Sequence, residues 1–263
     1  MVPSARQRAC SSGFSIVELM VSLALSSFVI LAVVGIYSGS RESYSTQDEI
    51  SRLHENVRIG VGLIERTLRQ GNYKRIPILR DQNLVLVQAF SFAPVAGTDG
   101  GGAASDTLEL VYNGNDQPTV PPSADGTIVD CVGEAVGADV QSRNRFSIQS
   151  IAGRPWLGCT RPNHPTNTAF VPLIPDVEAM QVLYGTYSDE SRTASNFVPW
   201  SAAIDPMRVV AIRLHLLFRS SEPIAPAPSN KVYTLAGEAY GPYTDRFVRT
   251  TVETTVVIRS AAM

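Results

Sequence analysis

The sequence predicts an α+β fold in which one long amino-terminal helix packs on an antiparallel β-sheet domain. Three observations carry this prediction. An apolar run lies near the amino terminus, apolar residues then recur at intervals of three and four, and from residue 78 onward they alternate with polar ones. The first two patterns are typical of helix, and the third is typical of strands with one buried face.

The composition excludes several classes of protein before any motif is considered. The chain has 263 residues, of which 44% are hydrophobic and 17% charged, so it is neither a disordered chain nor a multi-span membrane protein. A formal net charge of −2 gives no electrostatic basis for binding a nucleic-acid backbone. We therefore expect no nucleic acid among its direct partners.

The apolar run extends from Ile16 to Tyr37 and contains a single charged residue, Glu18. As a helix it would span about 33 Å, enough for a hydrocarbon core of about 30 Å. The segment before it carries Arg6 and Arg8 and no acidic residue. Because cationic flanks stay in the cytoplasm, we expect a single membrane pass with the rest of the chain exported.

An ordinary secretory signal peptide, cut near Ser38, is the alternative interpretation of this run. Two features oppose it. The run is longer than the usual apolar region of about 7–15 residues, and Glu18 lies just inside its start, where an unpaired carboxylate is disfavoured. Another property of the segment must account for the glutamate.

The helix is expected to continue beyond the membrane. Its second part has an apolar stripe with spacings of 3, 4, 4, 3 and 4, formed by Ile50, Leu53, Val57, Val61, Ile64 and Leu68. Gly71, followed by Pro77, is a suitable end. We therefore expect one helix from about Phe14 to Gln70, whose stripe packs on the sheet of the same chain.

Six segments are predicted to be strands: Leu84–Phe92, Thr107–Tyr112, Arg145–Ile151, Val177–Tyr187, Val209–Arg219 and Phe247–Arg259. Loops are expected between them at Pro94–Ser105, Asn113–Asp125 and Ser188–Ala203. The last two strands alternate most clearly, which predicts that Arg213, His215, Arg249, Glu253 and Arg259 face water.

The residues Gly13-Phe14-Ser15-Ile16-Val17-Glu18-Leu19 resemble the type III signal of type IV prepilins and pseudopilins. This family has a short basic leader, a glycine, a phenylalanine that becomes N-methylated and a glutamate four residues later. The resemblance implies that prepilin peptidase, a membrane aspartyl peptidase, cuts between Gly13 and Phe14 and methylates the new amino terminus. Four regions follow: a leader over 1–13, a transmembrane and filament-core helix over 14–38, an amphipathic helix over 39–71 and a β-rich periplasmic domain over 72–263.

Cleavage would give Glu18 a partner. The new α-amino group of Phe14 is cationic and lies less than two helical turns away, and a buried charge is tolerated when it is paired. Phe14 and Glu18 are therefore the candidate pair for docking subunits through their helices. The alternative places Glu18 at the membrane surface with its carboxylate in water.

The resemblance extends, more diffusely, to the carboxyl-terminal half. The order of Leu183-Tyr184-Gly185, the strand Val209–Arg219 and a terminal stretch from Asp245 to Arg259 is similar to that of PilW-type minor pilins. This implies a pilin-like fold and a non-enzymatic minor pilin that helps initiate a type IV pilus and sits at or near its tip. The implied partners are other minor pilins, the major pilin and the inner-membrane assembly platform.

The same resemblance implies a single-pass inner-membrane protein with a periplasmic domain, later incorporated into the extracellular pilus. Two alternatives remain. One is a J-like minor pseudopilin of a type II secretion system, which shares the anchor, long helix and β-rich domain. The other is an exported binding module or enzyme that uses the helix only as a membrane anchor.

Removal of the leader would also remove Cys10 and leave two cysteines. In an oxidising compartment Cys131 and Cys159 are expected to form a disulfide that fixes the irregular middle segment. Two buried free thiols are the alternative.

The sequence contains no recognisable catalytic or metal-binding pattern. The three histidines, His54, His164 and His215, are scattered, and the sequence has no zinc spacing, phosphate-binding glycine loop or nucleophile elbow. We expect no catalytic residue, metal or cofactor. A calcium site formed by loop aspartates is the weaker alternative to their usual role in turns; the candidates are Asp99, Asp106, Asp116 and Asp125.

Overall fold

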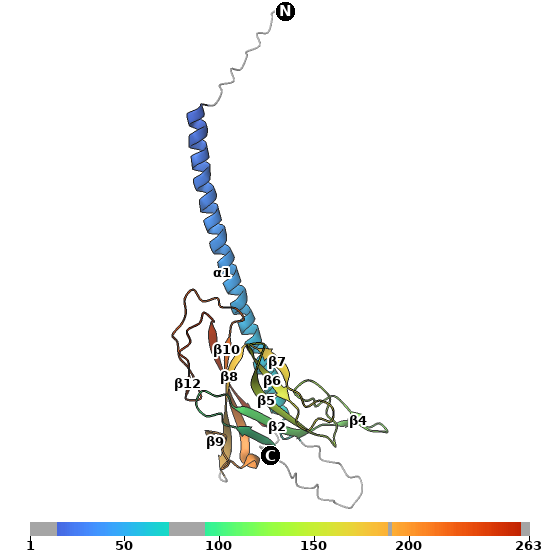
Figure 1. The fold of residues 1–263 in the computed structure, drawn as a ribbon. Helices are drawn as coiled ribbons and strands as arrows, with labels where there is room; N and C mark the ends of the chain where they lie inside the picture. Colours follow the sequence, from blue (N-terminus) through green and yellow to red (C-terminus); the bar gives the residue numbers. More distant parts are fainter. Residues whose placement is uncertain (1–14, 74–92, 189–190, 259–263) are drawn as a thin grey trace, which may run out of the picture. The chain divides into compact units, whose positions relative to one another are not determined.

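The computed structural model of the chain describes residues 15–73, 93–188 and 191–258 (Figure 1). The chain divides into two compact units, one up to Asp48 and one from Glu49 onward. Helix α1 (Ile16–Gln70) contributes residues to both units. Its carboxyl-terminal end lies where the sequence predicts it, and Phe14, its expected first residue, lies outside the described residues.

The second unit contains two main antiparallel sheets. One has the order β1-β2-β5-β6-β7, with the bounds β1 (Val95–Thr98), β2 (Thr107–Asn113), β5 (Gln141–Ile151), β6 (Arg154–Thr160) and β7 (Val171–Pro175). The other has the order β13-β10-β8-β9, with the bounds β13 (Arg249–Val257), β10 (Val209–Arg219), β8 (Val177–Ser188) and β9 (Ser191–Pro199). The predicted α+β class is therefore confirmed.

Three short elements complete the described part of this unit. Strands β3 (Asp116–Gln117) and β4 (Ser123–Ala124) form one small hairpin, and β11 (Tyr233–Leu235) and β12 (Glu238–Tyr240) form another. A 3-10 turn, η1 (Pro206–Arg208), precedes β10, and the Asp205 side chain caps it by accepting a hydrogen bond from Met207 N.

The second half of α1 shares one hydrophobic core with both sheets. Leu53, Ile64 and Leu68 are buried in this core, while Ile50, the first residue of the predicted stripe, is 36% exposed. Gly60 is buried where the helix approaches strand β10: an added Cβ would lie 3.2 Å from Cζ of Phe218. From Leu53 onward, the apolar stripe predicted from residue spacing is therefore the face of α1 that packs in this core.

A single residue, Asp176, joins the two sheets between β7 and β8. Its backbone φ is 61°, in the left-handed region that aspartate tolerates better than most residues. Its carboxylate is buried and accepts hydrogen bonds from Arg154 Nε at 2.9 Å and from Ser221 Oγ at 3.0 Å. The corner between the sheets is therefore fixed by charge-assisted bonds as well as by packing.

Several segments expected to be loops contain strands. Pro94–Ser105 includes β1, because Val95 is fully buried and pairs with Leu110. Ser188–Ala203 includes β9, which pairs with β8 despite its polar sequence. Asn113–Asp125 includes the hairpin of β3 and β4, and β6 and β7 were not predicted. The strand expected over Leu84–Phe92 lies outside the described residues.

The predicted water-facing sides of the last two strands need correction. Leu217, on the second face of β10, is buried, because the small hairpin of β11 and β12 places Leu235 and Tyr240 against it. His215 was expected to face water, yet its side chain is only 14% exposed, and Arg259 lies outside the described residues. Arg249 on β13 was expected to face water, yet its side chain is 1% exposed. Its guanidinium is tolerated there because carboxylates pair with it.

Candidate functional site

The amino-terminal part of α1 presents an apolar surface with one acidic group. Every large apolar side chain between Ile16 and Tyr37 is more than half exposed, and Glu18 lies in the first turn. By length and composition, α1 is the one helix of the described residues that could cross a membrane. An apolar surface of this extent requires lipid or neighbouring helices around it.

The polar side chains inside this stretch are satisfied by the helix itself. The hydroxyls of Ser22, Ser26 and Ser27 donate to backbone carbonyls one turn earlier, at 2.9, 2.7 and 2.8 Å. Glu18 carries the single charge of the apolar segment. Gly13 and Phe14, the expected processing site and the expected partner of Glu18, lie outside the described residues.

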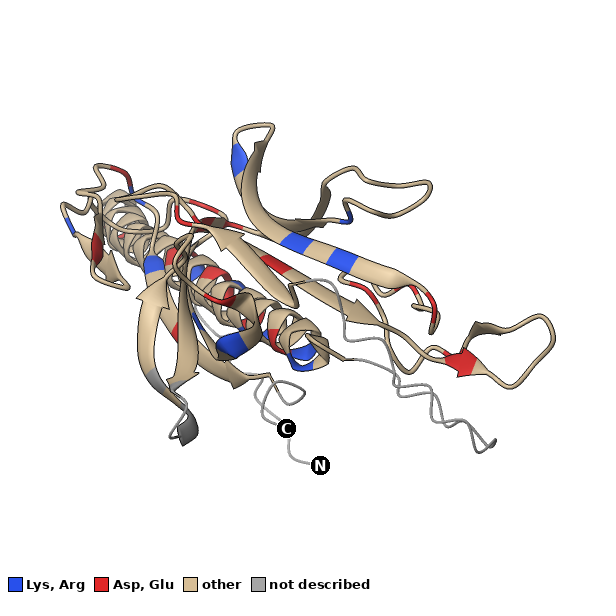
Figure 2. Ribbon diagram, turned by 90° about the horizontal axis from the view of Figure 1, so that it is seen from below, with Lys and Arg blue, Asp and Glu red and all other residues tan. Residues whose placement is uncertain are grey.

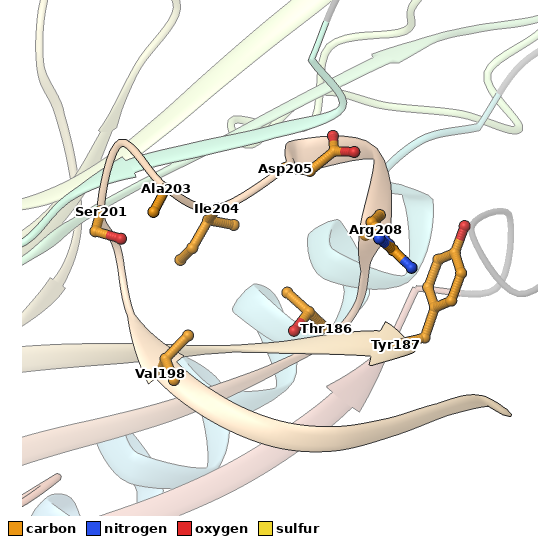
Figure 3. Close-up of a pocket in the computed structure, with 8 residues that line it drawn as sticks. All are labelled: Thr186, Tyr187, Val198, Ser201, Ala203, Ile204, Asp205 and Arg208. Carbon is orange, nitrogen blue, oxygen red and sulfur yellow. The ribbon is translucent and has the colours of Figure 1, made fainter. Parts of the chain in front are cut away.

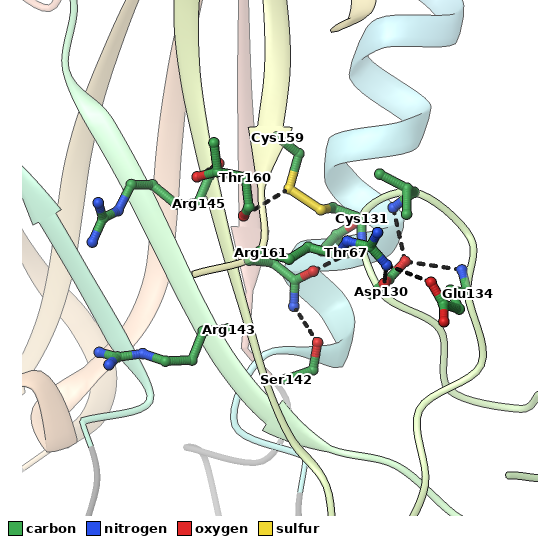
Figure 4. Close-up of a disulfide and its surroundings, with 12 residues drawn as sticks. Thr67, Asp130, Cys131, Glu134, Ser142, Arg143, Arg145, Cys159, Thr160 and Arg161 are labelled. Atoms are coloured by element: carbon green, nitrogen blue, oxygen red, sulfur yellow. Dashed lines mark hydrogen bonds and ion pairs between the residues drawn. A yellow bond between two sulfur atoms is a disulfide. The ribbon is translucent and has the colours of Figure 1, made fainter. Parts of the chain in front are cut away.

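A disulfide joins Cys131 to Cys159, with 6.4 Å between their Cα atoms (Figure 4). Cys131 lies in the loop between β4 and β5, Cys159 lies on β6, and both are buried. The loop is also held by Cys131 N, which donates to Oδ1 of Asn144 at 2.8 Å. The bond attaches an irregular segment to the five-stranded sheet.

Ion pairs beside the disulfide hold the same loop. Nη1 of the buried Arg161 donates to Oδ2 of Asp130 at 2.6 Å and to Oε2 of Glu134 at 2.5 Å (Figure 4). Nε2 of His164 lies 3.3 Å from Oε1 of Glu134. The hydrogen bond from Arg161, followed by that from His164, lowers the pKa of the Glu134 carboxyl. These contacts support the fold of the loop.

A pocket of about 620 Å³ lies between the ends of β8 and β9 and the segment over residues 201–208 (Figure 3). The Arg208 guanidinium lies over the Tyr187 ring, 5.3 Å from its centroid, and Ile204 and Val198 supply apolar lining. The sequence did not indicate this pocket. Its lining comes from β8, from β9 and from the segment over residues 201–208, and the alternation of apolar and polar residues does not predict that these three parts meet.

The four loop aspartates serve as local acceptors. Asp99, Asp116 and Asp125 accept backbone N–H groups of Gly101, Ala138 and Thr127. Asp106 is buried, accepts from Gly100 N and Val182 N, and has a raised pKa because of its burial. Residues 15–73, 93–188 and 191–258 contain no group of three or more His, Cys, Asp or Glu arranged to hold a metal ion.

Two family models match the chain. The one described as Type IV Pilus-assembly protein W matches residues 145–260, which run from within β5 past the end of β13. The Prokaryotic N-terminal methylation motif matches residues 8–34, which include Gly13, Phe14 and Glu18. Both matches agree with the resemblances found in the sequence.

The chain is also similar to a solved structure, the type IV-like pilin TTHA1219 from Thermus thermophilus. The two have a TM-score of 0.47 and 13% sequence identity, and the similarity covers 81% of this chain and 99% of that one. No curated protein matches the chain in sequence.

Proposed function

We propose that this chain, a type IV pilin-like protein with an N-terminal methylation motif and a match to pilus-assembly protein W, functions as a minor pilin. It helps to initiate assembly of a type IV pilus and sits at or near the pilus tip. It acts by assembling with other subunits and performs no catalysis.

The observation that carries this proposal is the lone carboxylate of Glu18 in the first turn of an exposed apolar helix. An isolated charge in lipid is costly, and a paired one is tolerated. Cleavage after Gly13 creates a cationic amino group on Phe14, and this group neutralises Glu18 in the same chain or in the adjacent one. Pairing with the adjacent chain would guide the helix from lipid into the filament core.

The same arrangement suggests where the protein resides and what it meets. The helix anchors the chain in the inner membrane after prepilin peptidase has acted, and the β domain faces the periplasm. There it meets other minor pilins, the major pilin and the assembly platform in the inner membrane. Incorporation into the pilus then carries the domain outside the cell.

The direct test compares two carboxylate removals in a strain that lacks the native gene. Glu18→Ala is expected to leave the protein in the membrane and to reduce the number of pili to that of the deletion strain. Glu42→Ala, which removes an exposed carboxylate farther along α1, is the matched control and should restore normal piliation. Normal piliation by Glu18→Ala would overturn the docking mechanism.

Two further measurements separate the alternatives. Deletion of the gene should abolish pili and leave protein secretion intact, whereas a J-like pseudopilin would show the opposite pattern. A chain truncated to residues 45–263 should lose all function in the cell, because it lacks the assembly helix. A tethered enzyme or binding module would retain its activity after this truncation.

A further inference from the structure

We propose that the outer face of the five-stranded sheet carries an oxyanion-binding site that takes a carboxylate side chain of a partner protein. The site is a hollow of about 330 Å³, lined by Ala96, Gly97, Thr98, Thr107, Glu109, Arg143 and Arg145. We call it the arginine hollow. It is separate from the disulfide, because Arg143 and Arg145 extend from β5 on the side away from the two cysteines (Figure 4).

The pairing of three strands assembles the arginine hollow. On β2, Glu109 stands opposite Ala96 of β1 and opposite Arg145 of β5. Arg143 lies two residues before Arg145 and therefore projects from the same face of the sheet. Figure 2 shows two basic positions close together on one strand, beside an acidic position on the neighbouring strand.

Two guanidinium groups share one carboxylate. Arg143 Nη2 forms an ion pair with Oε1 of Glu109 at 2.7 Å, and Oε2 of Glu109 accepts hydrogen bonds from Arg145 Nε at 2.9 Å and from Arg145 Nη2 at 2.7 Å. The Glu109 side chain is 4% exposed, while those of Arg143 and Arg145 are 46% and 49% exposed. One positive charge is thus left in excess, and it is presented to water.

Glu109 orients the two arginines without using all of their donors. Each guanidinium has five N–H donors, more than its contacts with Glu109 occupy, and its fork matches the two oxygens of a carboxylate. Exposed ion pairs are usually weak because ordering their side chains costs conformational entropy. Glu109 already orders both arginine side chains, so binding of an anion costs less of this entropy.

Hydroxyl groups and small residues complete the arginine hollow. Oγ1 of Thr98 and Oγ1 of Thr107 lie 2.8 Å apart, so one donates to the other and one O–H donor remains. Ala96 and Gly97 fill little space beside them. The volume exceeds that of a small inorganic anion, which favours a side chain together with part of the chain that carries it.

The test uses the full chain in detergent micelles with two probes, a hexaglutamate peptide and inorganic phosphate, at matched ionic strength. The wild-type protein should bind the peptide more tightly as salt is lowered. R143Q/R145Q should weaken peptide binding at least tenfold. R213Q/R246Q, which removes the same charge from arginines outside the hollow, should stay within twofold of wild type.

Three results would overturn the proposal: no peptide binding, equal weakening in both double variants, or phosphate bound as tightly as the peptide. The last would indicate a site for free anions. Because R143Q/R145Q leaves Glu109 buried without a partner, the triple variant E109Q/R143Q/R145Q provides a second measurement with that charge removed. It should melt cooperatively and still lack peptide binding, and a folded triple variant that binds like wild type would contradict the proposal.

Discussion

The hydroxyl of Thr254, on β13, donates a 2.6 Å hydrogen bond to Oε1 of Glu65, on helix α1. This bond joins the last described strand of the domain to the amino-terminal helix. The hydrophobic core shared by the helix and the sheets includes Ile64 and Leu68 on the helix and Val256 on the strand. The helix is therefore attached to the four-stranded sheet by a polar contact as well as by its apolar stripe.

Thr254→Val should lower the free energy of unfolding by about 1 kcal/mol, because it removes the hydrogen bond and keeps the shape of the side chain. Thr251→Val is the matched control, since Thr251 is exposed on the same strand, and it should change stability by less than about 0.5 kcal/mol. Denaturant unfolding of the detergent-solubilised protein measures both. Equal effects of the two variants would show that the bond to Glu65 contributes nothing.

Two helix glycines should respond oppositely to substitution. A Cβ at Gly60 would lie 3.2 Å from Phe218 Cζ and 3.4 Å from Ile174 Cγ2, whereas a Cβ at Gly62 would have no such neighbour within 4 Å. Gly60→Val should therefore destabilise the protein by about 1–3 kcal/mol through overpacking. Gly62→Ala should stabilise it by up to about 1 kcal/mol through helix propensity. Unfolding midpoints that move in the same direction would contradict this packing.

Removal of the disulfide should cost more than either glycine substitution. Cys131 and Cys159 are 28 positions apart, and the chain-entropy model assigns about 3.5 kcal/mol to closing a loop of that length. The double variant Cys131→Ser with Cys159→Ser should lose roughly that amount in denaturant unfolding. Reducing agent should lower the stability of the wild-type protein and leave the variant unchanged. Mass spectrometry that finds both thiols free in native protein would contradict the disulfide.

Acid should weaken the ion pair around Arg249. Asp245 binds its guanidinium through two hydrogen bonds of 2.7 Å, and these bonds lower the pKa of Asp245. The pKa of Asp245 is lower in the folded protein than in the unfolded chain, where an aspartate has a pKa of about 3.9. Its contribution to stability is therefore complete above that pH and is lost as the pH falls toward the pKa of the folded state.

Asp245→Asn should therefore reduce stability at pH 6 and flatten its dependence on pH below about 4. Unfolding midpoints of wild type and variant between pH 3 and pH 6 measure this effect. Asp139→Asn, a change at an exposed site, should leave the profile close to wild type. Parallel profiles for wild type and Asp245→Asn would rule out the contribution of this pair.

The sequence predicted the parts of the fold that local patterns encode. The three-and-four spacing located the packed face of α1, and clear alternation located β10 and β13. Strands β1 and β6 were missed because glycines interrupt them. At Gly158 on β6, for example, the ring of Phe170 occupies the space that a side chain would fill. Such a strand needs its neighbours before it can be recognised.

The candidate sites also differ in whether a local sequence pattern can indicate them. Glu18 was identified from the sequence because a single charge in an apolar run is visible locally. The burial of Arg249 depends on Glu178, which is 71 positions away, and alternation alone placed it in water. The arginine hollow likewise depends on the pairing of Glu109 with Arg145, 36 positions apart, so no window of the sequence indicated it.

The most direct test of the proposed function is the amino-terminal sequence and mass of the protein purified from its native membrane. We expect a mature chain that begins with N-methylated Phe14 and retains the FSIVE stretch. A chain that begins near residue 39, a soluble product without the apolar helix or an uncut leader would contradict the assembly mechanism.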